Sequence, residues 1–398
     1  MTGRIIRVRP KYIKSDYFDE LDKDVTLNYN EFFFNQGRSA LKHLLLCYSK
    51  FLNKKISIAI QSFNCRVVAD AAIESNCIIY LLDNKLTDFS ISLNSLQTIE
   101  KKIDVLLLTH YQGIPNFQYK EIAAFCKKSN ILLIEDLSLT EGSLINDKEV
   151  GSLGDFAIKS FAFDKPYSAM EGGSLIINNH VNKSLRKLII EAFHKIPHQS
   201  KFKSNNDLKF LKFLLKYTKP NFYHQSINYW NTLKFVSYFF NIKKIYRISF
   251  TPICNRYLEE FIKKTTKKKH IQIQRLRKEK INLLKLQRTN NKTLNLNVDR
   301  LNSMAANLGL WPVMNKNAEI IWNRYSILDD NNNLKQIFNK NNIEVGNYNW
   351  AVPLHLLFKN HHQIKIEDNL KNSEYCSKKI LNIPIWKEYN INIDIICQ

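Results

Sequence analysis

The stretch that decides the fold is residues 132–178, LLIEDLSLTEGSLINDKEVGSLGDFAIKSFAFDKPYSAMEGGSLIIN. It includes most of one short apolar run, ILLIED at 131–136, and all of another, SLIIN at 174–178. Three similar runs precede it at intervals of a dozen or more residues: ISIAI at 56–60, CIIYLLD at 77–83 and DVLLLTH at 104–110. Continuous apolar strands of this length, joined by helix-length segments, predict a mainly parallel sheet with helices on both faces.

Two of the connecting segments have apolar residues at helical spacing. They cover Arg38–Phe51 and Tyr119–Ser129, and Asn130 is a plausible stop for the second helix. We therefore expect an α/β domain in this part of the chain. From about residue 294 onward, strand-like and helical segments alternate again and end with LNIPIW at 381–386, which predicts a smaller α+β domain.

The composition is that of a globular protein with a sizeable core. The chain has 398 residues, 44% hydrophobic and 24% charged, enough for two or three domains or one large domain with a smaller companion. Lys and Arg outnumber Asp and Glu by 59 to 36, which gives a formal charge of +23. This charge favours anionic partners in general, but no specific nucleic-acid motif accompanies it. Part of this positive charge is expected to reflect an overall compositional bias of the chain toward Lys, Asn and Ile, without a functional meaning.

The N-terminus and the cysteines predict a cytoplasmic protein. Met1–Lys11 lacks the apolar core of a secretory signal, and no run of about 18 apolar residues occurs. The cysteines contain no CxxC pair, so we expect reduced thiols and neither a metal site nor a disulfide framework. There are seven of them, at positions 47, 65, 77, 126, 254, 376 and 397.

Residues 200–250 differ from the rest of the chain. They contain fourteen aromatic residues and ten Lys or Arg, with Asp207 as the single acid. We interpret them as inserted helices whose aromatic residues form core. The alternative is a basic aromatic surface in contact with lipid headgroups, which we do not favour. The Lys-rich residues 263–280 are expected to form a solvated helix face.

Three features in and near the deciding stretch predict a cofactor site. Asp136 ends a strand, where open α/β sheets bind ligands and where a carboxylate could meet the ring nitrogen of a heterocycle. Lys165 follows a short apolar run, and a partly desolvated lysine can attack a carbonyl to form a Schiff base. Gly37 opens a helix, whose free N–H groups are suited to phosphate. Taken singly, Asp136 would be a strand-end cap, Lys165 a surface lysine and Gly37 part of an ordinary turn. Their order and spacing together indicate a pyridoxal phosphate site.

These motifs resemble those of the DegT/DnrJ/EryC1/StrS aminotransferases, fold type I pyridoxal phosphate enzymes that act mainly on nucleotide-linked keto-sugars. The resemblance is close over residues 34–180 and loose over 250–398. Its most specific part is SFxxxKxxxxxEGG, which the chain matches at every stated position from Ser160 to Gly173. The other matches are QGRSAL at 36–41, QSF at 61–63, HxxG at 110–113, IED at 134–136, GSLGD at 151–155, PLH at 353–355 and the turn at 381–384.

The resemblance implies a large cofactor-binding α/β domain over 1–250, with a mainly parallel seven-stranded sheet sandwiched by helices, and a small C-terminal α+β domain over 251–398. It implies a homodimer with the active site at the subunit interface. The basic aromatic insert, at about 185–250, is then expected to cover the active-site mouth or extend that interface. The implied reaction moves an amino group from an amino-acid donor, such as glutamate, to an anionic nucleotide-linked keto-sugar in amino-sugar or surface polysaccharide biosynthesis.

It also implies roles for the matching residues. Lys165 would form the Schiff base with pyridoxal 5'-phosphate and then move a proton between substrate and cofactor carbons, while Asp136 would keep the pyridinium protonated. The phosphate would be bound at Gly37, Arg38, Ser39 and Ser160, and the guanidinium of Arg38 could add a fixed cation. The substrate would lie near His355 and Glu171.

Three positions depart from the family's pattern. Leu139 stands where the family usually has Gln or His near the cofactor's phenolic oxygen, and Cys65 where it stacks an aromatic residue on the cofactor. Residues 245–247, Ile-Tyr-Arg, are the best match to the family's Asn-Tyr-Arg element, which reaches into the partner subunit. Ile stands there in place of Asn. Two alternatives stay open: another pyridoxal phosphate reaction on the same fold, or a catalytically silent relative that acts as a binding protein.

Overall fold

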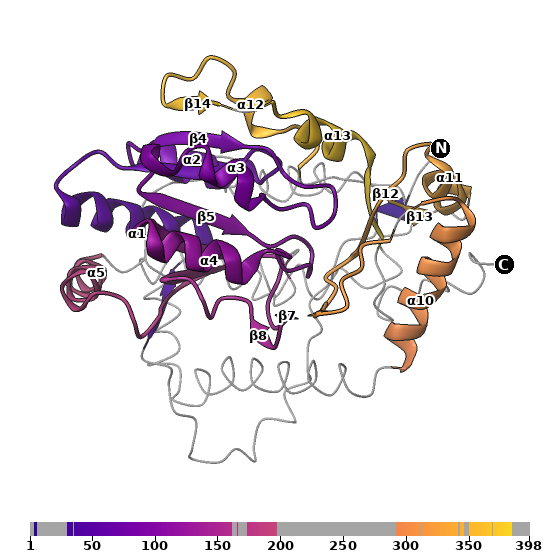
Figure 1. The fold of residues 1–398 in the computed structure, drawn as a ribbon, viewed down its shortest axis with the longest axis horizontal. Helices are drawn as coiled ribbons and strands as arrows, with labels where there is room; N and C mark the ends of the chain where they lie inside the picture. Colours follow the sequence, from indigo (N-terminus) through magenta and orange to yellow (C-terminus); the bar gives the residue numbers. More distant parts are fainter. Residues whose placement is uncertain are drawn as a thin grey trace, which may run out of the picture.

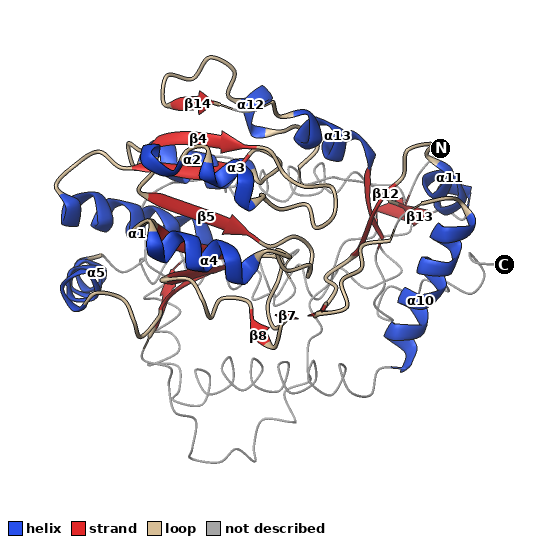
Figure 2. Cartoon of the chain, in the orientation of Figure 1, coloured by secondary structure: helices blue, strands red, loops and turns tan. Residues whose placement is uncertain are grey.

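An eight-stranded sheet forms the centre of the computed structural model (Figure 1, Figure 2). Its strand order is β14-β4-β3-β5-β6-β9-β10-β2. Neighbours are parallel from β14 to β9, whereas β10 runs antiparallel to both β9 and β2. The strands are β2 (Glu31–Phe34), β3 (Ser57–Gln61), β4 (Ile78–Leu82), β5 (Val105–Thr109), β6 (Leu132–Asp136), β9 (Phe156–Ser160), β10 (Gly173–Ile177) and β14 (Ile364–Ile366).

The structure describes the chain in several stretches. Glu171, the basic aromatic residues 200–250, the Lys-rich residues 263–280, the 245–247 element and Pro384 lie outside them. The described residues are 4–5, 30–34, 36–160, 165, 173–196, 292–310, 312–340, 343–345, 350–367 and 369–383.

The sheet confirms the α/β fold expected from the sequence and corrects its size. The five apolar runs form β3, β4, β5, β6 and β10, each within about one residue of its expected position. The sheet has eight strands rather than seven, because β14 adds to its β4 edge in parallel. Strand β14 is three residues long and half exposed to exposed, so its sequence carries little strand signal.

Helices cover both faces of the sheet. The helices α1 (Gly37–Leu52), α2 (Arg66–Glu74) and α5 (Lys183–Lys195) pack on one face, where Val105 and Leu107 are buried. On the other face lie α3 (Leu93–Gln97), the short 3-10 helix Glu100–Lys102 and α4 (Tyr119–Lys128), with the alternate residues Leu106 and Leu108. Burial on both faces explains why these strands are apolar without alternation. Asn130 has a left-handed φ of 53°, which confirms it as a helix stop.

The C-terminal part forms a second, smaller core. It contains α10 (Lys292–Asn307), α11 (Asn333–Lys340) and the antiparallel strands β12 (Tyr325–Leu328) and β15 (Ile380–Ile383), and its mixture of helices and strands confirms the expected α+β character. In Figure 1 these elements lie together at the side of the sheet opposite α5. The helices α12 (Leu354–Leu357) and α13 (Lys371–Lys379) connect this part to the sheet.

The remaining strands are two residues long. They are β1 (Arg4–Ile5), β7 (Leu144–Ile145), β8 (Lys148–Glu149), β11 (Ala318–Glu319) and β13 (Ile343–Glu344). Strand β1 pairs with β13, and β7 pairs with both β8 and β11. The pairing of β11 with β7 ties the second core to the loops that follow β6. Among the helices that the structure describes, none is long and apolar enough to cross a membrane.

Candidate functional site

The predicted site residues lie at one edge of the sheet, where its parallel strands end. Asp136 is the last residue of β6 and is paired with Thr109, the last residue of β5. Ser160 ends the next strand, β9, and pairs with Gly173, the first residue of the antiparallel β10. Ligands of open α/β sheets bind at this edge because loops and helix N-termini meet there.

The N-terminus of α1 packs directly against Ser160. A Cβ atom on Gly37 would lie 2.9 Å from the carbonyl oxygen of Lys159 and 3.4 Å from the Cβ of Ser160. One on Gly173 would lie 2.2 Å from the Gly37 nitrogen, so both positions require glycine. The residue before the helix, Gln36, provides no side-chain cap. A helix end without a cap, next to a serine hydroxyl, fits a bound phosphate.

Arg38, the second residue of α1, adds positive charge beside this helix end. Burial lowers the pKa of its guanidinium, and the neighbouring Cys65, Asp70 and Glu74 act in the opposite direction. Arginine nevertheless stays charged at neutral pH. The site therefore contains a partly desolvated cation within the first turn of α1.

Lys165 and Cys65 share one electrostatic environment with Asp136. Burial raises the pKa of the Cys65 thiol; the nearby positive charge of Lys165 lowers it, the Asp136 carboxylate raises it, and Arg38 lowers it. These side chains come from α1, from the last residue of β6 and from the loops after β3 and β9. The fold thus brings together the residues predicted for the Schiff base, the ring nitrogen and the cation, and this set fits pyridoxal phosphate.

A buried hydrogen-bond network holds the end of β6 in place. The carboxylate of Glu135, which is fully buried, accepts hydrogen bonds from Tyr119 Oη (2.8 Å), His110 Nε2 (3.2 Å) and the amides of Gly151 and Gly154 (2.6 Å each). Asp136 is the next residue along, and its Oδ1 accepts from the amide of Ser138 at 2.9 Å. The network therefore positions Asp136.

The same network gives a structural role to three motifs. The amide of Asn116 donates to Nδ1 of His110 at 3.0 Å, so the proton of the imidazole is on Nε2 and points at Glu135. Tyr119 Oη accepts from the amides of Ser152 and Leu153 at 3.1 and 2.9 Å. HxxG, IED and GSLGD thus meet around one buried carboxylate. Sequence analysis did not assign Glu135 a role, although a carboxylate inside an apolar strand was the available signal.

Two expected site residues have other surroundings. Leu139 is 4% exposed and belongs to the second core, with Phe63, Tyr111 and Trp322. In that core it offers no hydrogen bond to a cofactor ring. Cys65, half-buried before α2, packs at the border of the two cores.

His355 is bound on both ring nitrogens by protein groups. Its Nδ1 lies 2.7 Å from Oγ of Ser62, in the loop after β3, and its Nε2 lies 3.3 Å from the carboxylate of Glu374 in α13. The amide of Leu354 also donates to the carbonyl oxygen of Ser62 at 2.8 Å. The structure therefore places His355 between the sheet and the C-terminal part. Its expected contact with substrate stays a prediction.

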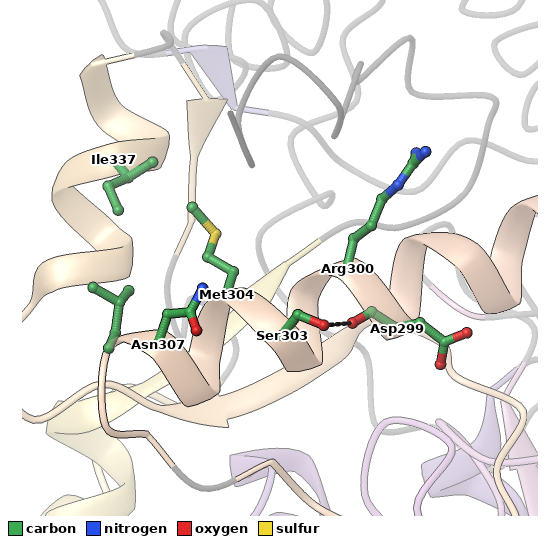
Figure 3. A pocket seen from close by; sticks show the side chains of 7 residues that line it. Asp299, Arg300, Ser303, Met304, Asn307 and Ile337 are labelled. Carbon is green, nitrogen blue, oxygen red and sulfur yellow. Dashed lines mark hydrogen bonds between the residues drawn. The ribbon is translucent and has the colours of Figure 1, made fainter.

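A separate pocket of about 340 Å³ lies between α10 and α11 (Figure 3). None of the predicted site residues borders it, so it is distinct from the strand-end site. Its lining consists of Asp299, Arg300, Ser303, Met304, Asn307, Leu308 and Ile337. In the described part of the chain, no group of three or more His, Cys, Asp or Glu is arranged to hold a metal ion.

Part of the chain is similar to a known enzyme family. Residues 33–206 match the model of the DegT/DnrJ/EryC1/StrS aminotransferase family. A similar curated protein is the UDP-4-amino-4,6-dideoxy-N-acetyl-beta-L-altrosamine transaminase of Campylobacter jejuni subsp. jejuni serotype O:23/36 (strain 81-176), with 29% identity over 161 residues. This match covers 38% of the chain and 41% of the transaminase, so the chain spans about two fifths of that relative's length.

Solved structures with the same fold cover more of the chain. A DegT DnrJ EryC1 StrS aminotransferase from Brucella abortus matches 92% of this chain and 84% of its own, with a TM-score of 0.61 and 15% identity. The E coli GDP-4-keto-6-deoxy-D-mannose-3-dehydratase, solved with bound hydrated PLP, matches 92% of this chain and 86% of its own, with a TM-score of 0.58 and 14% identity. These similarities show the fold of the chain.

Proposed function

Because residues 33–206 match the model of the DegT/DnrJ/EryC1/StrS aminotransferase family, we propose that the protein is a pyridoxal phosphate-dependent aminotransferase. It moves an amino group from an amino-acid donor, expected to be glutamate, to a keto group of a nucleotide-linked sugar, in amino-sugar or surface polysaccharide biosynthesis. The observation that carries this proposal is that Asp136 ends β6 and Ser160 ends the neighbouring β9, beside the uncapped N-terminus of α1 at Gly37. The activity for which the Campylobacter relative is named supports the substrate class.

Each residue has a defined task in this reaction. When bound, pyridoxal phosphate supplies an electron-withdrawing ring that stabilises charge at the reacting carbon. The N-terminus of α1 and Ser160 hold the phosphate, and Asp136 holds a proton at the ring nitrogen. Lys165 Nζ would hold the cofactor by a covalent bond and would take and return the proton at the reacting carbon.

The proposal extends to charge, assembly and location. A formal charge of +23 and the buried Arg38 suit a substrate that carries a diphosphate. We propose a homodimer with the site at the subunit interface, in the cytoplasm, as the family resemblance implies.

A second candidate is another pyridoxal phosphate reaction at the same site. The burial of Leu139 in the second core favours it, because a side chain that could bond the cofactor's phenolic oxygen is missing at that position. The fold that the chain shares with a GDP-4-keto-6-deoxy-D-mannose-3-dehydratase supports this candidate, because one fold can serve different reactions.

The test is a visible absorption spectrum of the protein with added pyridoxal phosphate, before and after glutamate. The variants are Lys165→Ala and, as a matched control, Lys148→Ala, which removes an exposed lysine from β8. We expect the band of covalently bound cofactor in the wild type and in the control, bleached by glutamate, and no such band in Lys165→Ala.

The other outcomes separate the alternatives. A band that persists in Lys165→Ala contradicts the assignment of this lysine. A normal band that does not respond to glutamate or to other amino donors favours the second candidate. No band in any of the three proteins indicates a silent relative that acts as a binding protein.

A further inference from the structure

Arg324 is a buried cation for which the described structure provides no counter-charge. It is 7% exposed, and its Nε atom is buried without a hydrogen-bond partner. Among the described residues, no carboxylate forms an ion pair with its guanidinium. Burying an unpaired charge strongly destabilises a fold, so an arginine kept in this state calls for a binding partner that the chain itself does not supply.

The segment that carries Arg324 is packed against the turn after β5. The amide of Asn323 donates to the carbonyl oxygen of Gln112 at 2.9 Å, and its side-chain amide donates to Oε1 of Gln112 at 2.7 Å. A Cβ atom on Gly113, whose φ is +101°, would lie 2.1 Å from the carbonyl oxygen of Ile321. The position of the Arg324 backbone is therefore closely determined.

A buried polar network joins β12 and β15 to the turn after β5. Arg324 directly precedes β12, whose second residue is Ser326. Ser326 Oγ donates to Oδ1 of Asn382 at 2.7 Å, and Nδ2 of Asn382 donates to Oη of Tyr111 at 3.0 Å. Burial raises the pKa of Tyr111, and the nearby charge of Arg324 opposes this effect. The charge of Arg324 thus acts on a buried hydroxyl that belongs to the turn after β5.

This position is at the same edge of the sheet as Asp136. The amide of Gly113, after β5, donates to Oγ1 of Thr140 at 2.9 Å, and the amide of Ile321 donates to Oγ of Ser143 at 2.8 Å. Thr140 and Ser143 belong to the loop that begins directly after Asp136. The turn after β5, the loop after β6 and the segment with Arg324 thus form one connected wall beside the strand ends.

We propose that Arg324 binds an anionic group of a substrate at this wall. Guanidinium groups bind carboxylate and phosphate oxygens through paired N–H bonds, so the bound anion supplies the charge that the protein lacks. The anion is the carboxylate of the amino-acid donor or a phosphate of the nucleotide-linked sugar. The assignment of these sources rests on the proposed function, whereas the binding of an anion by Arg324 does not.

The test compares Arg324→Met and Arg324→Lys with Arg186→Met. Arg186 is a matched control because its guanidinium is saturated by protein oxygens, donating to Oδ1 of Asn30 and to the carbonyl oxygen of Asn178, both at 2.7 Å. Calorimetric Kd values for 2-oxoglutarate, UDP and GDP are measured on the full chain with added pyridoxal phosphate. Thermal melting is recorded without these anions.

We expect Arg324→Met to weaken binding of one class of anion by about 10- to 100-fold and to raise the melting temperature by about 2 °C, because an unpaired buried charge is removed. Arg324→Lys keeps the charge without the paired geometry and is expected to fall between Arg324→Met and the wild type in affinity. Arg186→Met is expected to melt at a lower temperature and to bind these anions as the wild type does.

The outcomes assign the anion or overturn the proposal. Weaker binding of 2-oxoglutarate assigns the donor carboxylate, and weaker binding of UDP or GDP assigns the phosphate. Unchanged Kd values for all probes, or a lower melting temperature of Arg324→Met, make Arg324 structural and overturn the proposal. If the wild type fails to bind pyridoxal phosphate, the proposed function fails, but the same titrations still decide whether Arg324 binds an anion.

Discussion

At the scale of single residues, Asp136 shows how two adjacent carboxylates acquire different tasks. Glu135 and Asp136 alternate across β6, so their side chains point to opposite faces of the sheet. Glu135 is fully buried and accepts four hydrogen bonds, which makes it a structural anchor. Asp136 is 7% exposed at the strand end, where its Oδ1 is held by one amide. Its other oxygen remains available to a ligand.

The exchange Asp136→Asn tests this assignment. We expect the variant to bind pyridoxal phosphate through Lys165 but to transfer the amino group at least about 100-fold more slowly, because an amide does not keep the ring nitrogen protonated. Single-turnover absorbance changes with glutamate measure the rate. The control is Asp147→Asn in the turn between β7 and β8, where an asparagine tolerates the left-handed φ of 60°. A rate close to that of the wild type would remove Asp136 from the ring nitrogen.

At the scale of elements, α1 connects the site to the rest of the sheet. It begins at Gly37 beside Ser160, and its buried face packs on β9, β10, α2 and α5. His43, one turn and a half into the helix, is 6% exposed, and its Nε2 donates to the carbonyl oxygen of Ile189 in α5 at 3.1 Å. Burial lowers the pKa of this imidazole below its ordinary value of 6.5, and its hydrogen bond to Ile189 partly opposes the shift.

This lowered pKa predicts a loss of stability in acid. Below about pH 6.5 the unfolded chain binds a proton at His43 that the folded protein does not, so the free energy of unfolding decreases as the pH falls toward the folded-state pKa. His43→Gln keeps a donor for Ile189 but does not titrate, so its unfolding free energy should decrease less over the same range. Urea unfolding between about pH 7.5 and 5 measures the difference. The control is His362→Gln at an exposed histidine; equal slopes for His43→Gln and the wild type would contradict the prediction.

At the scale of the whole molecule, the C-terminal part is attached to the sheet through buried polar contacts at β4. Asp83, which follows β4, accepts hydrogen bonds from the amides of Asn372 and Ser373 at 2.9 and 2.7 Å and thereby caps the N-terminus of α13. His355 links α13 to the loop after β3, and β14 extends the sheet beyond β4. A carboxylate at a helix N-terminus is also favoured by the helix dipole.

Removal of this cap should loosen the C-terminal part. We expect Asp83→Ala to lower the free energy of unfolding by about 2 kcal/mol, because several buried donors lose their acceptor. Hydrogen exchange should accelerate in α13 and β15 more than in β5 or β6. The exposed Asp299 of α10 provides the control Asp299→Ala. Uniform exchange rates, with no local increase in α13, would show that the contact does not attach this part.

The sequence by itself determined four of the parallel strands and two of the main helices, and it predicted the residues of a cofactor site. Continuous apolar runs reveal strands that are buried on both faces, whatever their neighbours are. Gly37 and Gly173 mark a close backbone approach, which only glycine permits. Lys165 and Asp136 were predicted from the order and spacing of short motifs, because a site built from consecutive strand ends repeats the order of the chain.

Only the tertiary structure decided which side chains are partners across the chain. His355 contacts Ser62, although the two residues are 293 positions apart in the sequence. The short β14 pairs with the β4 edge of the sheet, which its own residues do not specify, and Leu139 packs in the second core. Arg324 appears in the sequence as one of many basic residues, and its burial without a counter-charge follows from the packing of the segment before β12 against the turn after β5. Local patterns report periodicity and burial, whereas the pairing of distant polar groups depends on how completed elements pack.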